Sequence, residues 1–582
     1  MANHSPADAR LLASYLRPER RPLAALVAVL VVAMLLPLAG PLLIGWFVNA
    51  ALDGASASQL AVLGGLFLAA TLTGDALQLV VTWYSVRLAW RVGNRLRVDL
   101  CRHALSLDLD WHGEHSAGQL IERIDGDIDA VTRFASMAVL QLAGNAVLVV
   151  GVLVITAFID WRACLVIAVT VGLAVLALAK MRTAAVPHYD AEREVQAKLY
   201  GDLEERLGGL EDLRANGAGA WAVQKLHEHS ARWWRTCRRA AAWGDAGLTL
   251  AGGVFALGSV AVLGLSAWQC RQGALSVGAV LTLLRFSQMV SDPLWKVAEQ
   301  LSEAQKAIAG ARRAGRLLAE QSALPDGSAE LADGPLSVQF DGVSFGYGTG
   351  TDVLHEVAFA LPAGSTVGVV GRTGSGKTTV GRLIARLWDV ESGAVLVGGH
   401  DVRHLAAADL RRRIGVVTQD VELFRASVRD NLTVFGAHDA DDAELVAALE
   451  AVGLGHWLGS LPAGLDQHLE GDTELSAGEG QRLSFARLLL ADPGLVILDE
   501  ASSRLDPATE ERLIAATERL LAGRTAVIIA HRLSTLDRVD HILVLDHGRV
   551  VEWGGRDDLA ADSSSRFYAL LAAGRATAGA GR

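Results

Sequence analysis

The segment GRTGSGKT, residues 371–378, has the residue types and the spacing of a loop that binds nucleotide phosphates. The strand-like run STVGVV precedes it, and TVGRLIARLW follows it with helical spacing. Its glycines would let backbone N–H groups close around phosphates at the start of a helix, while Lys377 reaches the β and γ oxygens and Thr378 binds Mg²⁺. We therefore predict a nucleotide site formed by Gly371, Arg372, Thr373, Gly374, Ser375, Gly376, Lys377, Thr378 and Thr379.

Lysine usage singles out the same loop. The chain has six lysines, and Lys377 is the only one after Lys306. A sequence that uses arginine nearly everywhere else thus keeps a compact ammonium group here, where a planar guanidinium would not fit the same space. We expect this lysine to be functional.

A second candidate is the pair of acids that ends LVILDE, residues 495–500. A short apolar run ending in acids is typical of a buried parallel strand that brings carboxylates to the carboxyl edge of a sheet. Asp499 suits Mg²⁺ binding through its water shell, and Glu500 suits orienting or deprotonating an attacking water. Two solvated acids at a strand end are the alternative, and the phosphate loop upstream argues against it.

The elements that must position these residues differ between the two halves of the chain. Its 582 residues are too many for one hydrophobic core, and before residue 310 there are apolar runs that can cross a hydrocarbon layer of roughly 30 Å. Six spans are predicted, at about 22–46, 59–83, 134–158, 162–181, 243–267 and 274–295. The polar segments at about 84–133 and 182–242 keep a helical period and are predicted to continue the membrane helices into the cytosol. After about residue 337 the pattern is that of a soluble α/β domain.

Charge sets the predicted orientation and excludes one class of partner. Arginines gather before the first span and in the two long polar segments, whereas the opposite loops are nearly uncharged. The positive-inside rule therefore places both termini in the cytoplasm of a multi-pass protein of the cell membrane. The net charge of −11 argues against a nucleic-acid partner. The lysine-poor, arginine- and alanine-rich composition suggests a bacterial source.

Arg285 and Gln288 are polar groups inside the last predicted span, just before a predicted break at DPL, residues 292–294. Polar and ionisable groups at membrane depth are costly and tend to face a water-filled cavity or a partner. We predict that these two side chains line a substrate cavity. Helix packing or an interfacial position is the alternative.

Residues 337 to about 575 resemble the nucleotide-binding domain of ATP-binding cassette (ABC) transporters. The motifs beyond the phosphate loop are VSFGY, VVTQDVELF, LVILDE, SRLD and IIAHRLS, in the family's order. The resemblance implies ATP and Mg²⁺ as ligands of a transport-coupled ATPase. It implies that Tyr347 stacks on adenine, that Gln419, Glu500 and His531 act in catalysis, that Thr378, Gln419 and Asp499 hold Mg²⁺, and that Asp506 lies in a loop crossing between two such domains.

The resemblance extends over most of the chain. The segment that begins RLAWRVGNRL is similar to the first intracellular segment of the exporter branch, and RLGGLEDLRANGAG to a coupling helix that crosses to the other subunit. The implied coupling helices lie near residues 110–118 and 206–216. The predicted fold is an α-helical six-span membrane domain with long cytoplasmic helical extensions, followed by an α/β P-loop nucleotide-binding domain. Its predicted parts are 1–21 (cytoplasmic segment), 22–310 (membrane domain), 311–336 (linker), 337–575 (nucleotide-binding domain) and 576–582 (tail).

The segment LSAGE aligns with the family's LSGGQ signature but ends in an acid. It is formed by Leu475, Ser476, Ala477, Gly478 and Glu479. The resemblance implies that this segment faces the γ-phosphate of the ATP held by the other half. A carboxylate there offsets part of a helix N-terminus's attraction for phosphate, and two like charges about 5 Å apart repel by roughly 3 kcal/mol at an effective dielectric constant near 20. A Glu479 that turns into solvent, or one that is simply tolerated, is the alternative.

These features predict an ATP-hydrolysing exporter half that moves a hydrophobic or amphipathic solute by alternating access. We expect it to pair with a different half-transporter that has an intact LSGGQ and no general-base glutamate. The other expected partners are membrane lipid and a small amphipathic solute. A homodimeric exporter, a lipid flippase and an importer of metal-chelate complexes are alternatives, whereas the six predicted spans exclude a soluble cassette protein.

Overall fold

The computed structural model describes residues 14–15, 17–137, 142–348, 350, 352–418, 421–470, 475–499, 517–518, 520–530 and 533–579. The chain divides into two units. The first is formed by Met1–Leu105 and Ala117–Glu320, and the second by Ser106–Ser116 and Gln321–Arg582. Residues 106–116 therefore belong to the unit that contains the phosphate loop.

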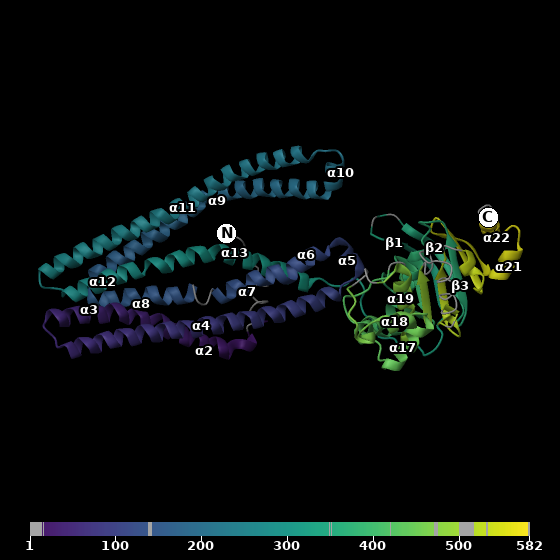
Figure 1. The fold of residues 1–582 in the computed structure, drawn as a ribbon, viewed down its shortest axis with the longest axis horizontal. Coiled ribbons are helices and arrows are strands. Elements are labelled where there is room, and N and C mark those ends of the chain that lie inside the picture. The colour runs from purple at the N-terminus through teal and green to yellow at the C-terminus, as the bar shows by residue number, and fades with distance from the viewer. Residues whose placement is uncertain are drawn as a thin grey trace. The chain divides into compact units, whose positions relative to one another are not determined.

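The first unit is helical (Figure 1). Its main helices are α2 (Arg20–Leu35), α3 (Ala39–Leu52), α4 (Ala57–Leu105), α6 (Ala117–Ile121), α7 (Asp127–Met137), α8 (Gly144–Ile159), α9 (Trp161–Gly208), α10 (Leu210–Ala215), α11 (Gly219–Arg271), α12 (Val277–Met289) and α13 (Ser291–Ala319). Within the described part of the chain, four stretches are long and apolar enough to cross a membrane: Arg17–Leu52, α4, α9 and α11. Helix α8 is apolar but shorter. The count of six spans stays a prediction.

The long polar segments continue the apolar helices, as predicted. Helix α4 has 49 residues, α9 has 48 and α11 has 53. The short helix α10 forms the turn between α9 and α11, which run beside each other (Figure 1). The helix break near DPL lies earlier than predicted, between Met289 and Ser291. Pro293 falls in the first turn of α13, where its missing N–H costs no intrahelical hydrogen bond.

The second unit contains two sheets. A six-stranded sheet has the order β10-β9-β3-β8-β7-β6, in which β10 is antiparallel to β9 and the other pairs are parallel. Its strands are β3 (Thr366–Gly371), β6 (Ile414–Val417), β7 (Leu495–Asp499), β8 (Thr525–Ile529), β9 (His541–Asp546) and β10 (Arg549–Gly555). An antiparallel sheet has the order β2-β1-β4-β5, with β1 (Val338–Gly346), β2 (Asp352–Leu361), β4 (Ser392–Val397) and β5 (His400–Asp401).

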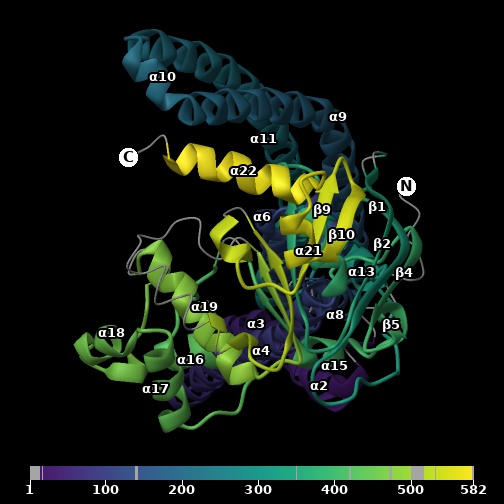
Figure 2. The ribbon, with the colours of Figure 1, turned by 90° about the vertical axis from the view of Figure 1, so that its right-hand side faces the viewer.

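Hydrophobic cores cover both faces of the six-stranded sheet. The helices of this unit are α5 (Leu109–Glu114), α14 (Lys377–Ile384), α15 (Ala407–Arg413), α16 (Val428–Thr433), α17 (Asp442–Ala451), α18 (Gly455–Ser460), α19 (Ala477–Ala491), α21 (Arg556–Ala561) and α22 (Arg566–Gly579). Figure 2 shows α16–α19 on one side of the six-stranded sheet and β1, β2 and β4 on the other. Along β7, Val496 and Leu498 pack toward the first group, while Leu495 and Ile497 pack toward the second. The apolar run before Asp499 is thus a strand buried on both faces, as predicted.

Candidate functional site

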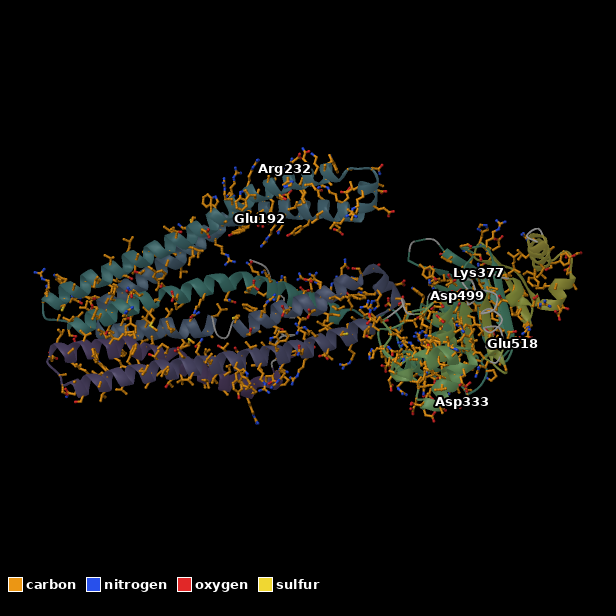
Figure 3. All side chains as sticks on the ribbon, viewed as in Figure 1. Glu192, Arg232, Asp333, Lys377, Asp499 and Glu518 are labelled. Atoms are coloured by element: carbon orange, nitrogen blue, oxygen red, sulfur yellow. The ribbon has the colours of Figure 1, made fainter. Side chains whose placement is uncertain are left out.

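The phosphate loop connects the end of β3 to the start of α14. Strand β3 lies beside β8, and β8 lies beside β7, all parallel, so their carboxyl ends meet at one edge of the sheet. The loop and Asp499 are therefore brought to the same edge, where both are labelled in Figure 3 through Lys377 and Asp499.

The backbone of the loop depends on glycine. Gly376 caps α14 with φ 97°, a left-handed conformation that side chains with a Cβ adopt at a cost. A Cβ at Gly376 would also lie 2.5 Å from Leu354 Cδ2. The side chain of Lys377 curls back over the loop, and its Nζ donates to the carbonyl oxygens of Gly371 at 2.8 Å and Arg372 at 3.1 Å. These bonds hold a buried ammonium group at the mouth of the loop.

The hydroxyls of the loop fit a phosphate and a magnesium ion. Ser375 is 3% exposed, and its Oγ has no hydrogen-bond partner among the described residues. A buried hydroxyl without a partner is costly, and a phosphate oxygen would satisfy it. Thr378 Oγ1 lies 3.4 Å from Asp499 Oδ1. Hydroxyl and carboxylate oxygens are the ligands that Mg²⁺ prefers, so the donor set fits this ion.

Tyr347, which follows β1, packs beside the loop helix. Its hydroxyl lies 3.1 Å from Thr379 Oγ1, and the Arg382 guanidinium donates to it at 3.3 Å. The Tyr347 ring meets the Trp388 ring edge-to-face at 5.2 Å, and Arg382 lies over both rings. The predicted adenine-stacking residue is thus next to the phosphate loop, in a cluster of two aromatic rings and one cation. Its contact with adenine stays a prediction.

Trp388 also contacts α5, a link that sequence reasoning missed. Its indole Nε1 donates to Asp110 Oδ1 at 2.6 Å, although the two residues are 278 positions apart. Asp108 caps α5 by accepting the Trp111 amide at 2.9 Å, and its other oxygen accepts the Ala323 amide at 2.7 Å. Partial burial works against ionisation of Asp108, but these backbone hydrogen bonds outweigh it and hold its pKa below the ordinary value. The sequence signal that could have indicated this contact is Trp388 itself, a tryptophan that follows the phosphate-loop helix closely.

The signature segment forms a capped helix N-terminus. Ser476 is the N-cap of α19, and Glu479 at the third helical position completes a capping box. Glu479 Oε2 accepts the Ser476 backbone N–H at 2.9 Å and the Ser476 hydroxyl at 2.8 Å. Its other oxygen lies 3.9 Å from Arg482. The carboxylate is therefore held against the serine, and the alternative that it turns into solvent is not what the structure has.

Other predicted site residues cannot be placed in the same way. Gln419, Glu500, Asp506 and His531 lie outside the described residues, and in the sequence three of them come one or two positions after β6, β7 and β8. Leu475 is buried, and Gly478 lies in the first turn of α19. Ala477 is the first residue of that helix. Arg285 and Gln288 both lie on the exposed face of α12, and their place in a substrate cavity stays a prediction.

Comparison with known proteins gives consistent matches along the chain. The ABC transporter transmembrane region matches residues 23–294, and the ABC transporter domain matches residues 354–503. An uncharacterized ABC transporter ATP-binding protein of Bacillus subtilis is 31% identical over 94% of this chain and 92% of its own length. An ATP-dependent lipid A-core flippase of Cupriavidus pinatubonensis is 30% identical over 98% of this chain and 97% of its own length. A fatty acid ABC transporter ATP-binding/permease protein of Mycobacterium bovis is 32% identical over 80% of this chain and 74% of its own length.

A solved structure has the same fold. The structure of a bacterial Atm1-family ABC exporter with ATP bound superimposes with a TM-score of 0.77, at 23% identity, over 93% of this chain and 96% of that one. Helical membrane region and α/β nucleotide-binding domain therefore occur in the same order in both.

Proposed function

The chain belongs to the ABC transporter family, with a transmembrane region and an ATP-binding domain in one polypeptide. From that premise we propose that it is one subunit of a heterodimeric exporter, the subunit that carries the altered signature. Its activity is ATP hydrolysis coupled to transport across a membrane. In the proposal, its own phosphate loop hydrolyses ATP against a normal signature from a different chain. Its own altered signature faces an impaired site on that partner.

The residues of the loop divide the work on ATP. Loop amides and the Ser375 hydroxyl bind phosphate oxygens, and Lys377 places a positive charge where charge develops in the transition state. Bound Mg²⁺ would neutralise phosphate charge, and Thr378 and Asp499, whose oxygens are 3.4 Å apart, are proposed to hold it. Glu500 is proposed to orient the attacking water, with His531 and Gln419 completing the site. Tyr347 is proposed to stack on adenine.

The observation that carries the asymmetry is the bond between Glu479 and Ser476. A serine hydroxyl has one hydrogen, and here it is donated to a carboxylate at 2.8 Å. A phosphate approaching α19 would have to replace that bond and would meet a negative charge at the helix N-terminus. Both effects would weaken the binding of this signature to a partner's ATP. Arg482, at 3.9 Å, offsets only part of the charge.

We propose that α5 couples the nucleotide site to the membrane region. It is joined to the rest of the second unit through the Trp388–Asp110 and Ala323–Asp108 hydrogen bonds. Trp388 in turn contacts Tyr347, so one ring lies between the proposed adenine site and α5. The short helix α10 is proposed as the second coupling helix, reaching the partner subunit. ATP-driven closure would then be carried to the helices that leave α5 and α10.

The transported solute is proposed to be hydrophobic or amphipathic and to move outward, with both termini in the cytoplasm. The names of relatives support an amphiphile, since they include a lipid A-core flippase and a fatty acid transporter. A lipid flippase is therefore a second candidate of the same kind. The proposed boundaries remain 22–310 for the membrane domain and 337–575 for the nucleotide-binding domain, with a linker between them.

The experiment that tests the pairing compares two preparations. The chain is purified alone and together with a co-expressed second exporter half that has LSGGQ and no general-base glutamate. We expect a one-to-one complex with robust ATPase and only weak ATPase from the chain alone. Robust ATPase from the homodimer would count against obligate pairing.

A further inference from the structure

A cavity of about 380 Å³ lies inside the first unit, between the N-terminal part of α2, the second half of α4, and helices α7 and α13. Its walls are almost wholly apolar and include Leu26, Leu88, Leu96, Val131, Phe134 and Ile308. Protein interiors are close-packed, and few voids exceed the size of a water molecule. A cavity of this volume with apolar walls has the size and lining of a ligand pocket.

The wall also contains buried polar side chains. Thr132 is 4% exposed, and its Oγ1 has no hydrogen-bond partner among the described residues. It faces Gly93 on α4, where a Cβ would lie 2.2 Å from this oxygen. The other hydroxyls of the wall are engaged, since Tyr15 donates to Asp99 and Ser85 donates to the Thr82 carbonyl. Because that oxygen is buried against Gly93, the pocket offers a ligand an almost wholly apolar space.

Positive charge flanks the pocket. Glu19 is 4% exposed and lies between the lining residues Tyr15 and Leu23 in the sequence. It is ion-paired with both Arg91 and Arg95 at 3.2 Å. Two arginines against one glutamate leave one net positive charge there. The arginine side chains are 45% and 47% exposed, so they can reach a further anion.

Along α4, the exposed side chains change from aliphatic to aromatic and basic at about the level of the pocket. They include Leu79 and Val80, and then Trp83 and Trp90. Arg87 stacks on Trp83 at 5.0 Å. Tryptophan and arginine in this pattern mark the level of lipid head groups, with aliphatic side chains in the hydrocarbon layer. The pocket, which α4 lines between Ser85 and Leu96, therefore lies at the level expected for the membrane interface.

We propose that this pocket binds an acyl chain of an anionic membrane lipid, whose head group contacts Arg91 while the chain fills the space beside Thr132. The site is built from one chain, and its lining includes neither Arg285 nor Gln288 of α12. The proposal rests on the membrane location of the first unit and does not depend on the pairing proposed above.

Photo-cross-linking of the full-length chain in phosphatidylcholine vesicles tests the site. Three probes each carry a diazirine on an acyl chain: phosphatidylglycerol, phosphatidylcholine and a free fatty acid. We expect phosphatidylglycerol to label residues 85–96 and 131–135 at least fivefold above the lipid-facing part of α4 at 60–80. Equal labelling along α4, or stronger labelling of the pocket by the free fatty acid, would overturn the proposal.

Two variants and a control sharpen the result. Ala89→Phe fills the pocket and should lower labelling of 131–135 at least fivefold, whereas Ala76→Phe, on the exposed face of the same helix, should not. Arg91→Gln leaves Glu19 paired with Arg95 and should lower labelling by phosphatidylglycerol toward that by phosphatidylcholine. This second variant changes only an exposed side chain, so it serves if Ala89→Phe does not fold. Unchanged phosphatidylglycerol labelling in Arg91→Gln would contradict the head-group assignment.

Discussion

The carboxylate of Glu479 accepts hydrogen bonds from both polar hydrogens of Ser476, the backbone N–H at 2.9 Å and the hydroxyl at 2.8 Å. A capping box of this kind stabilises the start of α19. It also engages the serine that we propose to face a partner's ATP. In that proposal, local helix stability and phosphate binding compete for the same hydroxyl.

The ammonium of Lys377 should not be replaceable by a guanidinium. It is 5% exposed and bonds two loop carbonyls, so the larger, planar group of an arginine at this position would displace the loop. We expect Lys377→Arg to lower ATPase about 100-fold, close to Lys377→Met, since about 2.7 kcal/mol of charge-assisted bonding is lost. Lys306→Arg, on the exposed face of α13, is the matched control and should keep full activity. An active Lys377→Arg enzyme would refute the steric argument.

Removal of Mg²⁺ should mimic the loss of Asp499. Thr378 and Asp499 are 3.4 Å apart and are proposed to share the ion. We expect ATP to raise the melting temperature of the wild type more with Mg²⁺ than with EDTA, because binding to the native state adds stability. In Asp499→Asn the two conditions should give the same shift. Asp546→Asn, at the end of β9 on the same sheet, should behave as the wild type.

Trp388 should hold α5 against the rest of the second unit. Trp388→Phe keeps an aromatic ring beside Tyr347 but removes the N–H that donates to Asp110 at 2.6 Å. A hydrogen bond to a charged group contributes roughly 1.5 kcal/mol, so residues 106–116 should exchange amide hydrogen about tenfold faster. Hydrogen exchange read by mass spectrometry measures this, and ATP binding should change less than threefold. Trp457→Phe, on α18, is the control, and equal exchange in both variants would argue against the link.

Acid should loosen the same contact through Asp108. Its pKa is lowered in the folded chain, so its stabilising effect is present above the ordinary pKa of 3.8 and is lost as the pH falls through the folded value. We expect Asp108→Asn to lower the melting temperature by about 2 °C between pH 5 and 8. The gap between variant and wild type should begin to narrow as the pH falls below 3.8. A gap that stays constant to pH 3 would show that ionisation of Asp108 has no part in docking α5.

The phosphate loop and β7 were predictable from local patterns. Each is marked by a few neighbouring residues, the glycines and the lysine for the loop and a short apolar run for the strand. Leu495–Asp499 form a strand buried on both faces, and the polar segments continue the long helices, as their periodicity indicates. The link between Trp388 and Asp110 was not predictable, since it joins residues 278 positions apart and leaves no spacing to detect. The cavity beside Thr132 likewise depends on how four helices approach one another. The charge of Glu479 was evident from the sequence, whereas its hydrogen bond with Ser476 is seen only in the structure.

The ATPase rate of the purified chain alone, compared with that of Glu479→Gln, measures directly whether the charge of Glu479 impairs this signature. Glutamine keeps the capping box and removes the charge, and Glu444→Gln in the matching capping box of α17 is the control. The full repulsion of roughly 3 kcal/mol is reduced by Arg482 and by solvent, so we predict an increase of about tenfold. A wild-type homodimer that already hydrolyses ATP as fast as Glu479→Gln would contradict the account.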